Sequence, residues 1–172
     1  MADLIQALAR WRVRLGFVCG AVAVGLAHPT GPSLAAGVAV ALIGESLRIW
    51  AAGHLEKGRE VTKSGPYSLV RHPLYLGSSI IGLGVCIAAA RIVVAIIVLG
   101  YLGTTFSAAI RTEEAWMRQT FGDEYDTYLQ APVQPAARRF SLARARANRE
   151  YRAVAGLVAV AAILALKALL AN

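Results

Sequence analysis

Two short polar clusters interrupt a largely apolar sequence, and both hold residue types that could do chemistry. The first cluster reads Gly65-Pro66-Tyr67, then Arg71-His72-Pro73-Leu74-Tyr75. Pro73 suits the first turn of a helix, where its missing N–H costs nothing, and this puts His72 at the helix start. Free backbone N–H groups beside Arg71 and two tyrosines would suit a carboxylate or another anion. The alternative is a capped helix entry with interfacial tyrosines and no ligand.

The second cluster begins at the adjacent pair Glu113-Glu114 and continues with Phe121-Gly122-x2-Tyr125-x2-Tyr128. Neighbouring glutamates on a helix are usually solvated, and Glu114 can pair with Arg118 one turn later. These two, however, follow an apolar stretch directly, close to the lipid headgroups, where basic residues are more common. A carboxylate accepts hydrogen bonds from ribose hydroxyls or from an ammonium group. Alone, the pair does not distinguish a site from a solvated surface.

The composition is that of a protein in contact with lipid. Of the 172 residues, 57% are hydrophobic and 16% are charged, whereas globular proteins have about 45–50% and about 25%. The mean hydropathy is +0.54. Two cysteines, Cys19 and Cys86, exclude a disulfide-built mini-domain and leave no Cys-x-x-Cys pair, so no metal site is expected.

The apolar segments predict an all-α polytopic membrane protein with about five transmembrane helices. Residues 73–110 contain one charge, Arg91, and as a single helix they would be about 57 Å long, far beyond a hydrocarbon core of about 30 Å. The chain must therefore turn back near Arg91. We expect a single domain, 1–172, and a retained first helix rather than a cleaved signal peptide. The predicted spans are about 12–28, 33–54, 73–90, 92–112 and 152–171.

The basic residues predict the orientation of these spans. With the N-terminus inside, the inside segments are 1–14, 55–72 and 111–152, and they hold 15 of the 18 lysines and arginines. Cytoplasmic loops are enriched in these residues, so both polar clusters should face the cytosol. The net charge of +8 then reflects topology and attraction to anionic lipids, and no nucleic-acid partner is expected. Abundant alanine and arginine-rich loops favour a prokaryotic source and its cytoplasmic membrane.

The two clusters form one ordered pattern. It reads Gly65-Pro66-Tyr67-x3-Arg71-His72-Pro73-x-Tyr75-x-Gly77, then Glu113-Glu114 and Phe121-Gly122-x2-Tyr125-x2-Tyr128. This pattern resembles the isoprenylcysteine carboxyl methyltransferase family, which belongs to a wider group that includes the phospholipid N-methyltransferases. The resemblance covers about residues 40–130, and the C-terminal span lies outside it.

The resemblance implies a cytosol-facing site for S-adenosyl-L-methionine, made by the loop after the second helix, the start of the third and the end of the fourth. Arg71 and Arg111 are the candidates that would position the methyl acceptor, since the substrate arginine of the family falls at Ala109. The eukaryotic members carry histidine where Arg59 stands. The cofactor-binding residues implied by the resemblance are His54, Arg59, Glu60, Val61, Thr62, Tyr67, His72, Pro73, Leu74, Tyr75, Glu113 and Glu114.

Three polar residues of the second span have two interpretations each. His54, at the end of the span, is either a cofactor contact or a structural histidine. Glu45 and Arg48 stand one turn apart inside the span, where charges are rare and either pair with each other or face a cavity. They are therefore either an ion pair that stabilises the helices or part of a substrate channel.

The expected chemistry is methyl transfer to a lipophilic acceptor that enters from the bilayer. Such a displacement mainly requires donor and acceptor to be held close together without water. A carboxylate acceptor needs no general base, whereas an amine must lose a proton. We therefore expect methyl esterification of a prenylcysteine-like carboxylate. The alternatives are N-methylation of a phospholipid amine, S-methylation of a small thiol and, in another class, a non-catalytic membrane scaffold.

Overall fold

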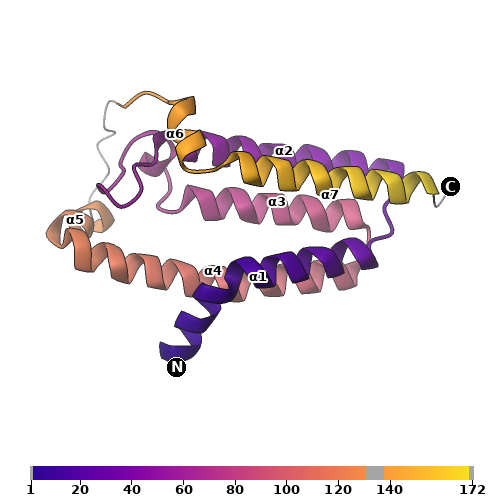
Figure 1. The fold of residues 1–172 in the computed structure, drawn as a ribbon, viewed down its shortest axis with the longest axis horizontal. Helices are drawn as coiled ribbons and strands as arrows, with labels where there is room; N and C mark the ends of the chain where they lie inside the picture. The colour runs from indigo at the N-terminus through magenta and orange to yellow at the C-terminus, as the bar shows by residue number, and fades with distance from the viewer. Residues whose placement is uncertain (1, 131–137, 171–172) are drawn as a thin grey trace.

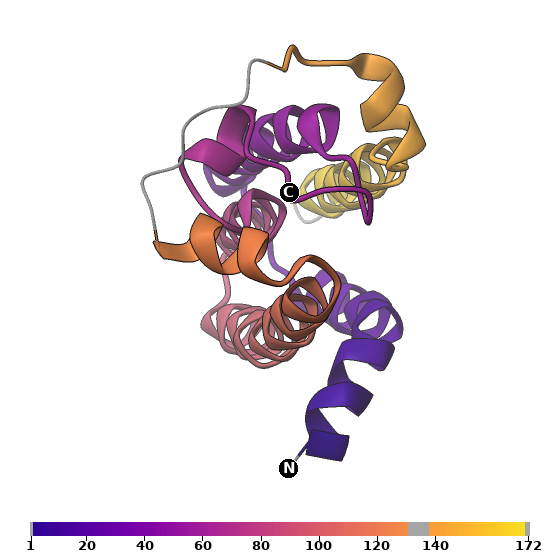
Figure 2. The ribbon, with the colours of Figure 1, turned by 90° about the vertical axis from the view of Figure 1, so that its left-hand side faces the viewer.

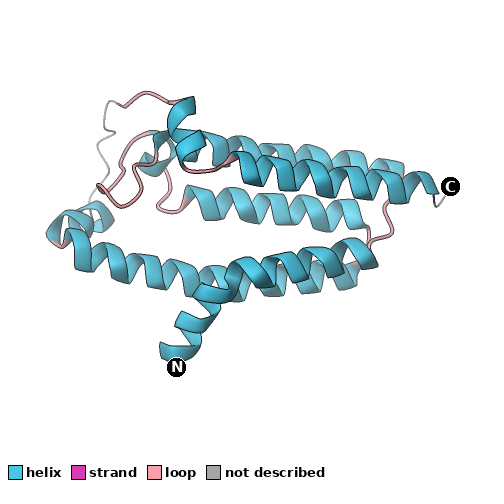
Figure 3. Ribbon diagram, in the orientation of Figure 1, coloured by secondary structure: helices cyan, strands magenta, loops and turns pink. Residues whose placement is uncertain are grey.

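The computed structural model describes residues 2–130 and 138–170, and all regular elements in these residues are helical. The predicted all-α fold is confirmed (Figures 1 and 3). The long helices are α1 (Ala2–Leu26), α2 (Gly31–His54), α3 (Pro73–Ala89), α4 (Ile92–Phe121) and α7 (Tyr151–Leu170). The short elements are the 3-10 helix η1 (Gly65–Ser68) and the helices α5 (Asp123–Gln130) and α6 (Leu142–Ala147).

Three of the long helices, α2, α4 and α7, are long and apolar enough to cross a membrane. The helix α3 is apolar but only 17 residues long. The helix α1 carries Arg10, Arg12 and Arg14 and is not among the candidate spans. All five predicted spans are thus helices, and three of them have the length and hydropathy of a full membrane crossing.

The chain reverses direction near Arg91, as the sequence predicts. The helix α3 ends at Ala89, the next residue Ala90 has a left-handed backbone (φ 51°), and Arg91 is extended before α4 begins. The connection from α1 to α2 lies beside this turn, because the N–H of His28 donates a hydrogen bond to the carbonyl of Ala89 (2.9 Å). We call this end of the helical bundle the turn end, and the opposite end, with residues 55–72, α5 and α6, the loop end.

The helices α2 and α3 pack closely because glycines face each other. A Cβ on Gly37 would overlap the carbonyl oxygen of Gly84, and a Cβ on Gly44 would lie 2.6 Å from the carbonyl oxygen of Gly77. Small residues allow helix backbones in a membrane to approach and gain van der Waals contact. This packing fixes the rotation of α2, including the positions of Glu45 and Arg48.

The helix α3 lies in the middle of the bundle, with α2 and α7 on one side and α1 and α4 on the other (Figure 2). A core of small and branched apolar residues, including Ala23, Ala88 and Val94, fills the turn end. The Lys167 ammonium donates to the carbonyls of Val24 and Gly25, both at 2.8 Å, and so joins α7 to the end of α1.

The structure differs from the predicted elements at two places. The helix α1 begins at Ala2 rather than near residue 12, because the intervening residues are good helix formers without glycine or proline. The helices α5 and α6 were not predicted. The helix α4 ends at Phe121 before Gly122, whose φ is 49°, as the sequence indicates.

Candidate functional site

The start of α3 meets the end of α4 at the loop end of the bundle. Pro73 occupies the first turn of α3 and His72 precedes it, as predicted. The Nε2 atom of His72 lies 3.0 Å from Oε1 of Glu114, and the imidazole packs edge-on against the Tyr75 ring, with 5.9 Å between ring centroids. The structure thus joins the two polar clusters of the sequence, which are about 40 residues apart.

Tyr75 connects this contact to the second glutamate. The negative charge of the Glu113 carboxylate acts on the Tyr75 hydroxyl, and the Tyr75 ring packs against Phe106 with 5.1 Å between centroids. Glu113 itself is exposed, so its carboxylate has capacity to accept further hydrogen bonds.

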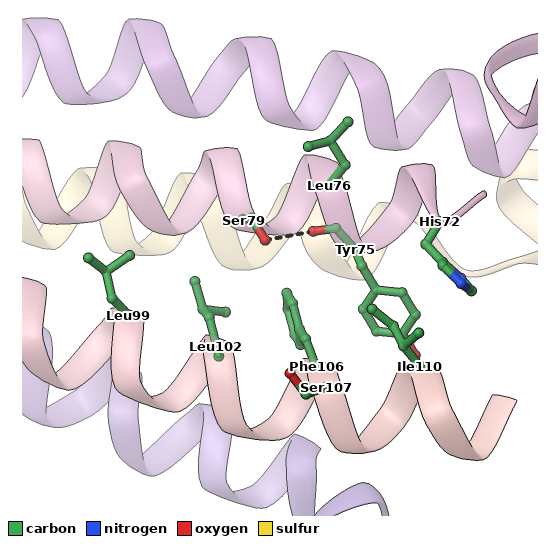
Figure 4. A pocket seen from close by; sticks show the side chains of 10 residues that line it. His72, Tyr75, Leu76, Ser79, Leu99, Leu102, Phe106, Ser107 and Ile110 are labelled. Atoms are coloured by element: carbon green, nitrogen blue, oxygen red, sulfur yellow. Dashed lines mark hydrogen bonds between the residues drawn. The ribbon is translucent and has the colours of Figure 1, made fainter. Parts of the chain in front are cut away.

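A cavity of about 430 Å³ opens beside these residues, between α3 and α4. His72 and Tyr75 stand at its end nearest the loops, and apolar side chains such as Leu99 and Leu102 line the rest (Figure 4). Two hydroxyls, of Ser79 and Ser107, also face it. The cavity is thus polar at one end and apolar along the helices, which suits a molecule with a polar head and an apolar chain.

Tyr67 is buried in η1, the short helix that precedes α3. The Tyr128 hydroxyl donates to the Tyr67 carbonyl (2.9 Å) and ties η1 to α5. Burial, followed by the negative charge of Glu113, raises the pKa of the Tyr67 hydroxyl. The charges of Glu150 and Arg48 also act on this hydroxyl.

The loop that carries the other predicted cofactor residues packs against α5. Val61 is buried in a small cluster with Tyr125 and Tyr128. The Thr62 hydroxyl accepts a hydrogen bond from the backbone N–H of Glu56 (3.3 Å), which closes the loop on itself. The Arg59 side chain is 83% exposed and lies near Glu56, with 3.9 Å between Nη1 and Oε2.

Residues 138–148, which we call the C-terminal arm, hold this loop in place. Arg138 makes a two-armed ion pair with Glu60, with contacts of 2.5 and 2.7 Å, and the Arg144 Nε donates to Glu56 (2.7 Å). The Asn148 amide donates to two carbonyls at the end of α2, both at 2.9 Å. The contact with Arg144 lowers the pKa of the Glu56 carboxyl, and the contact with Glu60 raises the pKa of Arg138.

The sequence did not single out the C-terminal arm. Its arginines contribute to the predicted orientation of the chain, but their partners are about 80–90 residues away, so no local pattern reveals the contacts. The one signal in the sequence was that residues 138–148 are rich in arginine while the loop 55–72 contains two glutamates, Glu56 and Glu60.

The two predicted acceptor-positioning arginines lie apart from the cavity of Figure 4, which neither of them lines. The Arg71 guanidinium donates to the carbonyl of Leu129 (2.9 Å), at the end of α5. Arg111 is exposed on α4, one residue after Ile110, which does line the cavity. Their roles with an acceptor stay predictions.

Arg48 has a stronger partner than the predicted Glu45. Its guanidinium binds Glu150 with both arms, at 2.7 and 3.1 Å, and its Nε lies 3.9 Å from the nearest oxygen of Glu45. It also donates to the Ser78 hydroxyl and to the Leu74 carbonyl. Arg48 is thus part of an ion pair, as predicted, but its closer partner is Glu150 and not Glu45. Glu150 is the one acidic residue after Asp126, a signal that sequence reasoning missed.

His54 is buried at the end of α2. Its Nδ1 lies 3.1 Å from the Ser64 hydroxyl, and its ring packs near Phe140 of the C-terminal arm. A Cβ on Gly65 (φ 58°) would lie 2.6 Å from the imidazole, so glycine is required there on two grounds. These contacts fit the structural interpretation of His54, and a cofactor role stays a prediction.

The groups at the loop end fit the chemistry of S-adenosyl-L-methionine. This cofactor carries an ammonium, a sulfonium and ribose hydroxyls. Glu113 and Glu114 can accept hydrogen bonds from the ammonium or the hydroxyls, and the rings of Tyr75 and Phe106 can face a cation. The exposed Glu113 carboxylate beside a half-buried aromatic pair is the observation on which this fit depends.

Comparisons with known proteins agree with this geometry. The family model described as phospholipid methyltransferase matches residues 33–124, which include both polar clusters. A cobalt-zinc-cadmium resistance protein of Cupriavidus metallidurans is 33% identical over 64% of this chain and 55% of its own length. A protein-S-isoprenylcysteine O-methyltransferase of Schizosaccharomyces pombe is 34% identical over 49% of this chain and 36% of its own length.

A nickel-cobalt-cadmium resistance protein of Alcaligenes xylosoxydans xylosoxydans is 34% identical over 54% of this chain and 42% of its own length. The chain therefore spans about half the length, or less, of the curated relatives it matches. No solved structure matches significantly.

Proposed function

The chain belongs to the phospholipid methyltransferase family, whose model matches more than half of it, and we propose that it is a membrane methyltransferase that uses S-adenosyl-L-methionine and acts on a lipophilic acceptor. The observation that carries this proposal is the contact of His72 with Glu114, where α3 begins and α4 nears its end, beside a largely apolar cavity that His72 and Tyr75 line. The polar end would hold the cofactor, and the apolar walls would hold the chain of the acceptor.

The cofactor, when bound, supplies an electrophilic methyl group on a positively charged sulfur. Glu113 and Glu114 would orient it through its ammonium or its ribose hydroxyls. Tyr75, packed against His72 and Phe106, would present its ring to the positive charge. The side chains around Tyr67, which are buried, would exclude water from the reacting atoms. In this proposal the protein contributes position and solvent exclusion more than acid or base.

The leading acceptor is a carboxylate on a lipophilic, prenylcysteine-like molecule. A carboxylate is ionised at neutral pH and needs no base, and one similar protein is named as an isoprenylcysteine O-methyltransferase. Arg71 or Arg111 would approach such an anion after a change of side-chain rotamer, since both are exposed.

A second candidate acceptor is a phospholipid amine. The observation in its favour is the contact of His72 with Glu114 at 3.0 Å beside the cavity, because an imidazole oriented by a carboxylate can accept the proton that an amine must lose. The description of the matching family favours the same acceptor. Methylation of a small thiol has no structural observation in its support.

We also propose that the loop end faces the cytosol of a prokaryotic cell and that the acceptor enters sideways from the cytoplasmic membrane. The support is the distribution of arginine and lysine: residues 55–72 and 111–152, together with the start of α1, hold most of them. The cofactor would then arrive from water and the acceptor from lipid.

The experiment that tests the function uses the full chain purified in detergent. Calorimetry should detect binding of S-adenosylhomocysteine, and Glu113→Ala should weaken it about tenfold or more, the effect expected for a hydrogen bond to a charged group. Glu124→Ala is the matched control, because Glu124 pairs with Lys63 on an exposed surface away from the cavity. Equal affinity in wild type and Glu113→Ala would overturn the site, and no binding by wild type would favour the non-catalytic scaffold.

Transfer is measured with methyl-labelled cofactor and fractionated membrane lipids. Label that alkali releases indicates an ester and a carboxylate acceptor. Label that withstands alkali and comigrates with an aminophospholipid indicates the amine.

A further inference from the structure

A second cavity, of about 450 Å³, lies among α1, α2, α3, α4 and α7. None of the residues predicted to bind the cofactor lines it. Most of its wall is apolar and comes from Phe17, Ile81, Val85, Leu157 and Val160. Its polar wall consists of Glu45, Arg48, Ser78 and Tyr101. This cavity is therefore separate from the one shown in Figure 4.

Glu45 is the unusual group in this wall. The residue is only 4% exposed, and neither carboxylate oxygen has a hydrogen-bond partner among the described residues. Its contact with Arg48 is long, 3.9 Å between Oε2 and Nε, and burying a carboxylate that accepts no hydrogen bond is costly. Glu45 nevertheless occupies this position. The preceding residue, Gly44, packs on α3, and Glu45 itself lines the cavity.

The other polar groups of the wall are already engaged. Arg48 binds Glu150 with both arms and also contacts Ser78. The Ser78 hydroxyl donates to the carbonyl of Leu74 (2.8 Å), and the Tyr101 hydroxyl donates to the carbonyl of Arg12 (2.8 Å). Glu45 is therefore the one ionisable acceptor of this wall that is left for a ligand among the described residues.

We propose that this cavity binds an amphipathic amine, with the ammonium on the Glu45 carboxylate and the alkyl chain along the apolar wall. A cationic ligand is favoured by the charge of the wall. Arg48 contacts both Glu45 and Glu150, so one positive side chain faces two acidic ones. An acid would bring a second carboxylate next to Glu45, and an alcohol would supply a hydrogen bond without a compensating charge. The proposal concerns binding and does not depend on methyl transfer.

The size of the cavity agrees with this ligand class. Ligand cavities have volumes of about 300–1,000 Å³ and are mostly apolar, with a few polar groups that fix the orientation. Water alone is the competing occupant, since buried polar groups are often hydrated. If the cavity is built for an amphipathic amine, binding of an amphiphile should saturate and should depend on its head group. If the cavity holds only water, neither should be observed.

The test uses the full chain in phosphatidylcholine nanodiscs and three probes with the same chain: decylamine, decanol and decanoate. Binding is measured by native mass spectrometry and by calorimetry. Wild type should bind decylamine saturably and about tenfold or more tightly than decanol or decanoate. Glu45→Gln should remove this preference, whereas Glu124→Gln, on the exposed surface of α5, should leave it unchanged.

A second variant guards against misfolding of Glu45→Gln. Gly156 lines the cavity, and a Cβ there meets no atom within 4 Å, so the backbone tolerates a side chain at this position. Gly156→Leu should therefore occupy part of the cavity and abolish decylamine binding. Helical content by circular dichroism should match wild type in both variants. Equal binding of the three probes, or decylamine binding that survives Glu45→Gln, would overturn the proposal, as would the absence of saturable binding in wild type.

Discussion

Arg48 and Glu150 are 102 residues apart in the sequence and form a two-armed ion pair, with Nε–Oε1 at 2.7 Å and Nη2–Oε2 at 3.1 Å. The pair joins the second half of α2 to the residue that precedes α7, and the Arg48 guanidinium also donates to Ser78 of α3. The Arg48 side chain thus connects α2 with α3 and with the start of α7.

The first prediction concerns the stability that this pair provides. Arg48→Ala leaves two buried glutamates without a cation, so it should lower the free energy of unfolding by about 3–5 kcal/mol. Glu45→Gln is the matched control, because the Glu45 oxygens make no hydrogen bond; it should be neutral or stabilising. Unfolding is followed by circular dichroism in mixed micelles. Equal losses in the two variants would contradict the role assigned to Glu150.

The second prediction concerns the C-terminal arm. Arg138 holds Glu60, a residue of the predicted cofactor loop, and both side chains are partly exposed. Arg138→Ala should therefore cost a modest amount, about 0.2–1 kcal/mol, seen as a weaker affinity for S-adenosylhomocysteine. Arg139→Ala, one residue further along the exposed surface, should change nothing. A stronger effect of Arg139→Ala than of Arg138→Ala would show that net charge matters rather than the contact with Glu60.

The third prediction concerns Arg71. If Arg71 holds an anion of cofactor or acceptor, Arg71→Lys should cost about 1.5–3 kcal/mol of transition-state stabilisation, because lysine lacks the two-armed geometry. A fall in both turnover and cofactor affinity would assign the cofactor carboxylate, and a fall in turnover alone would assign the acceptor. Full activity would leave Arg71 with its structural contact to the Leu129 carbonyl.

The fourth prediction concerns pH. Burial raises the pKa of Tyr67, and burial together with the charge of Glu114 raises the pKa of Tyr125 to about 12. An unfolded tyrosine titrates near 10, so above that pH the unfolded state binds fewer protons than the folded state and stability falls as pH rises. Stability should therefore decrease between about pH 10 and 12.

The matched variants separate this effect from the loss of positive charge at high pH. Tyr125→Phe should reduce the slope of stability against pH in this range. Tyr151→Phe alters an exposed ring and should keep the wild-type slope. An unchanged slope in Tyr125→Phe would refute the contribution of the buried phenol. Thermal midpoints measured in detergent at each pH give the slope.

The fifth prediction concerns orientation. Single cysteines at Lys63 and Arg139, in a chain whose Cys19 and Cys86 are replaced by alanine, should resist labelling by an impermeant maleimide added to intact cells. Cysteines at His28 and Arg91, on the turn end, should be labelled. The opposite pattern would invert the proposed topology and move the site to the outer face.

Much of the fold was predictable because lipid imposes strong constraints on a sequence. Long uncharged segments must be helices in a bilayer, since every backbone polar group needs an internal partner. The 38 residues from 73 to 110 had to reverse, and they do so at Ala90 and Arg91. The encounter of His72 with Glu114 could be predicted only through the family resemblance, because their spacing alone does not show how α3 and α4 are aligned.

The sequence by itself determined the long helices, the reversal at Arg91 and the types of residue available for chemistry, because these follow from local propensity, hydropathy and charge. Only the tertiary structure decided which charged groups meet. Arg48 makes its closer ion pair with Glu150 and not with Glu45, which is nearer in the sequence, and Arg138 pairs with Glu60. Ion pairs between distant segments depend on how the helices pack and not on spacing along the chain. The same packing left Glu45 buried and without a hydrogen-bond partner.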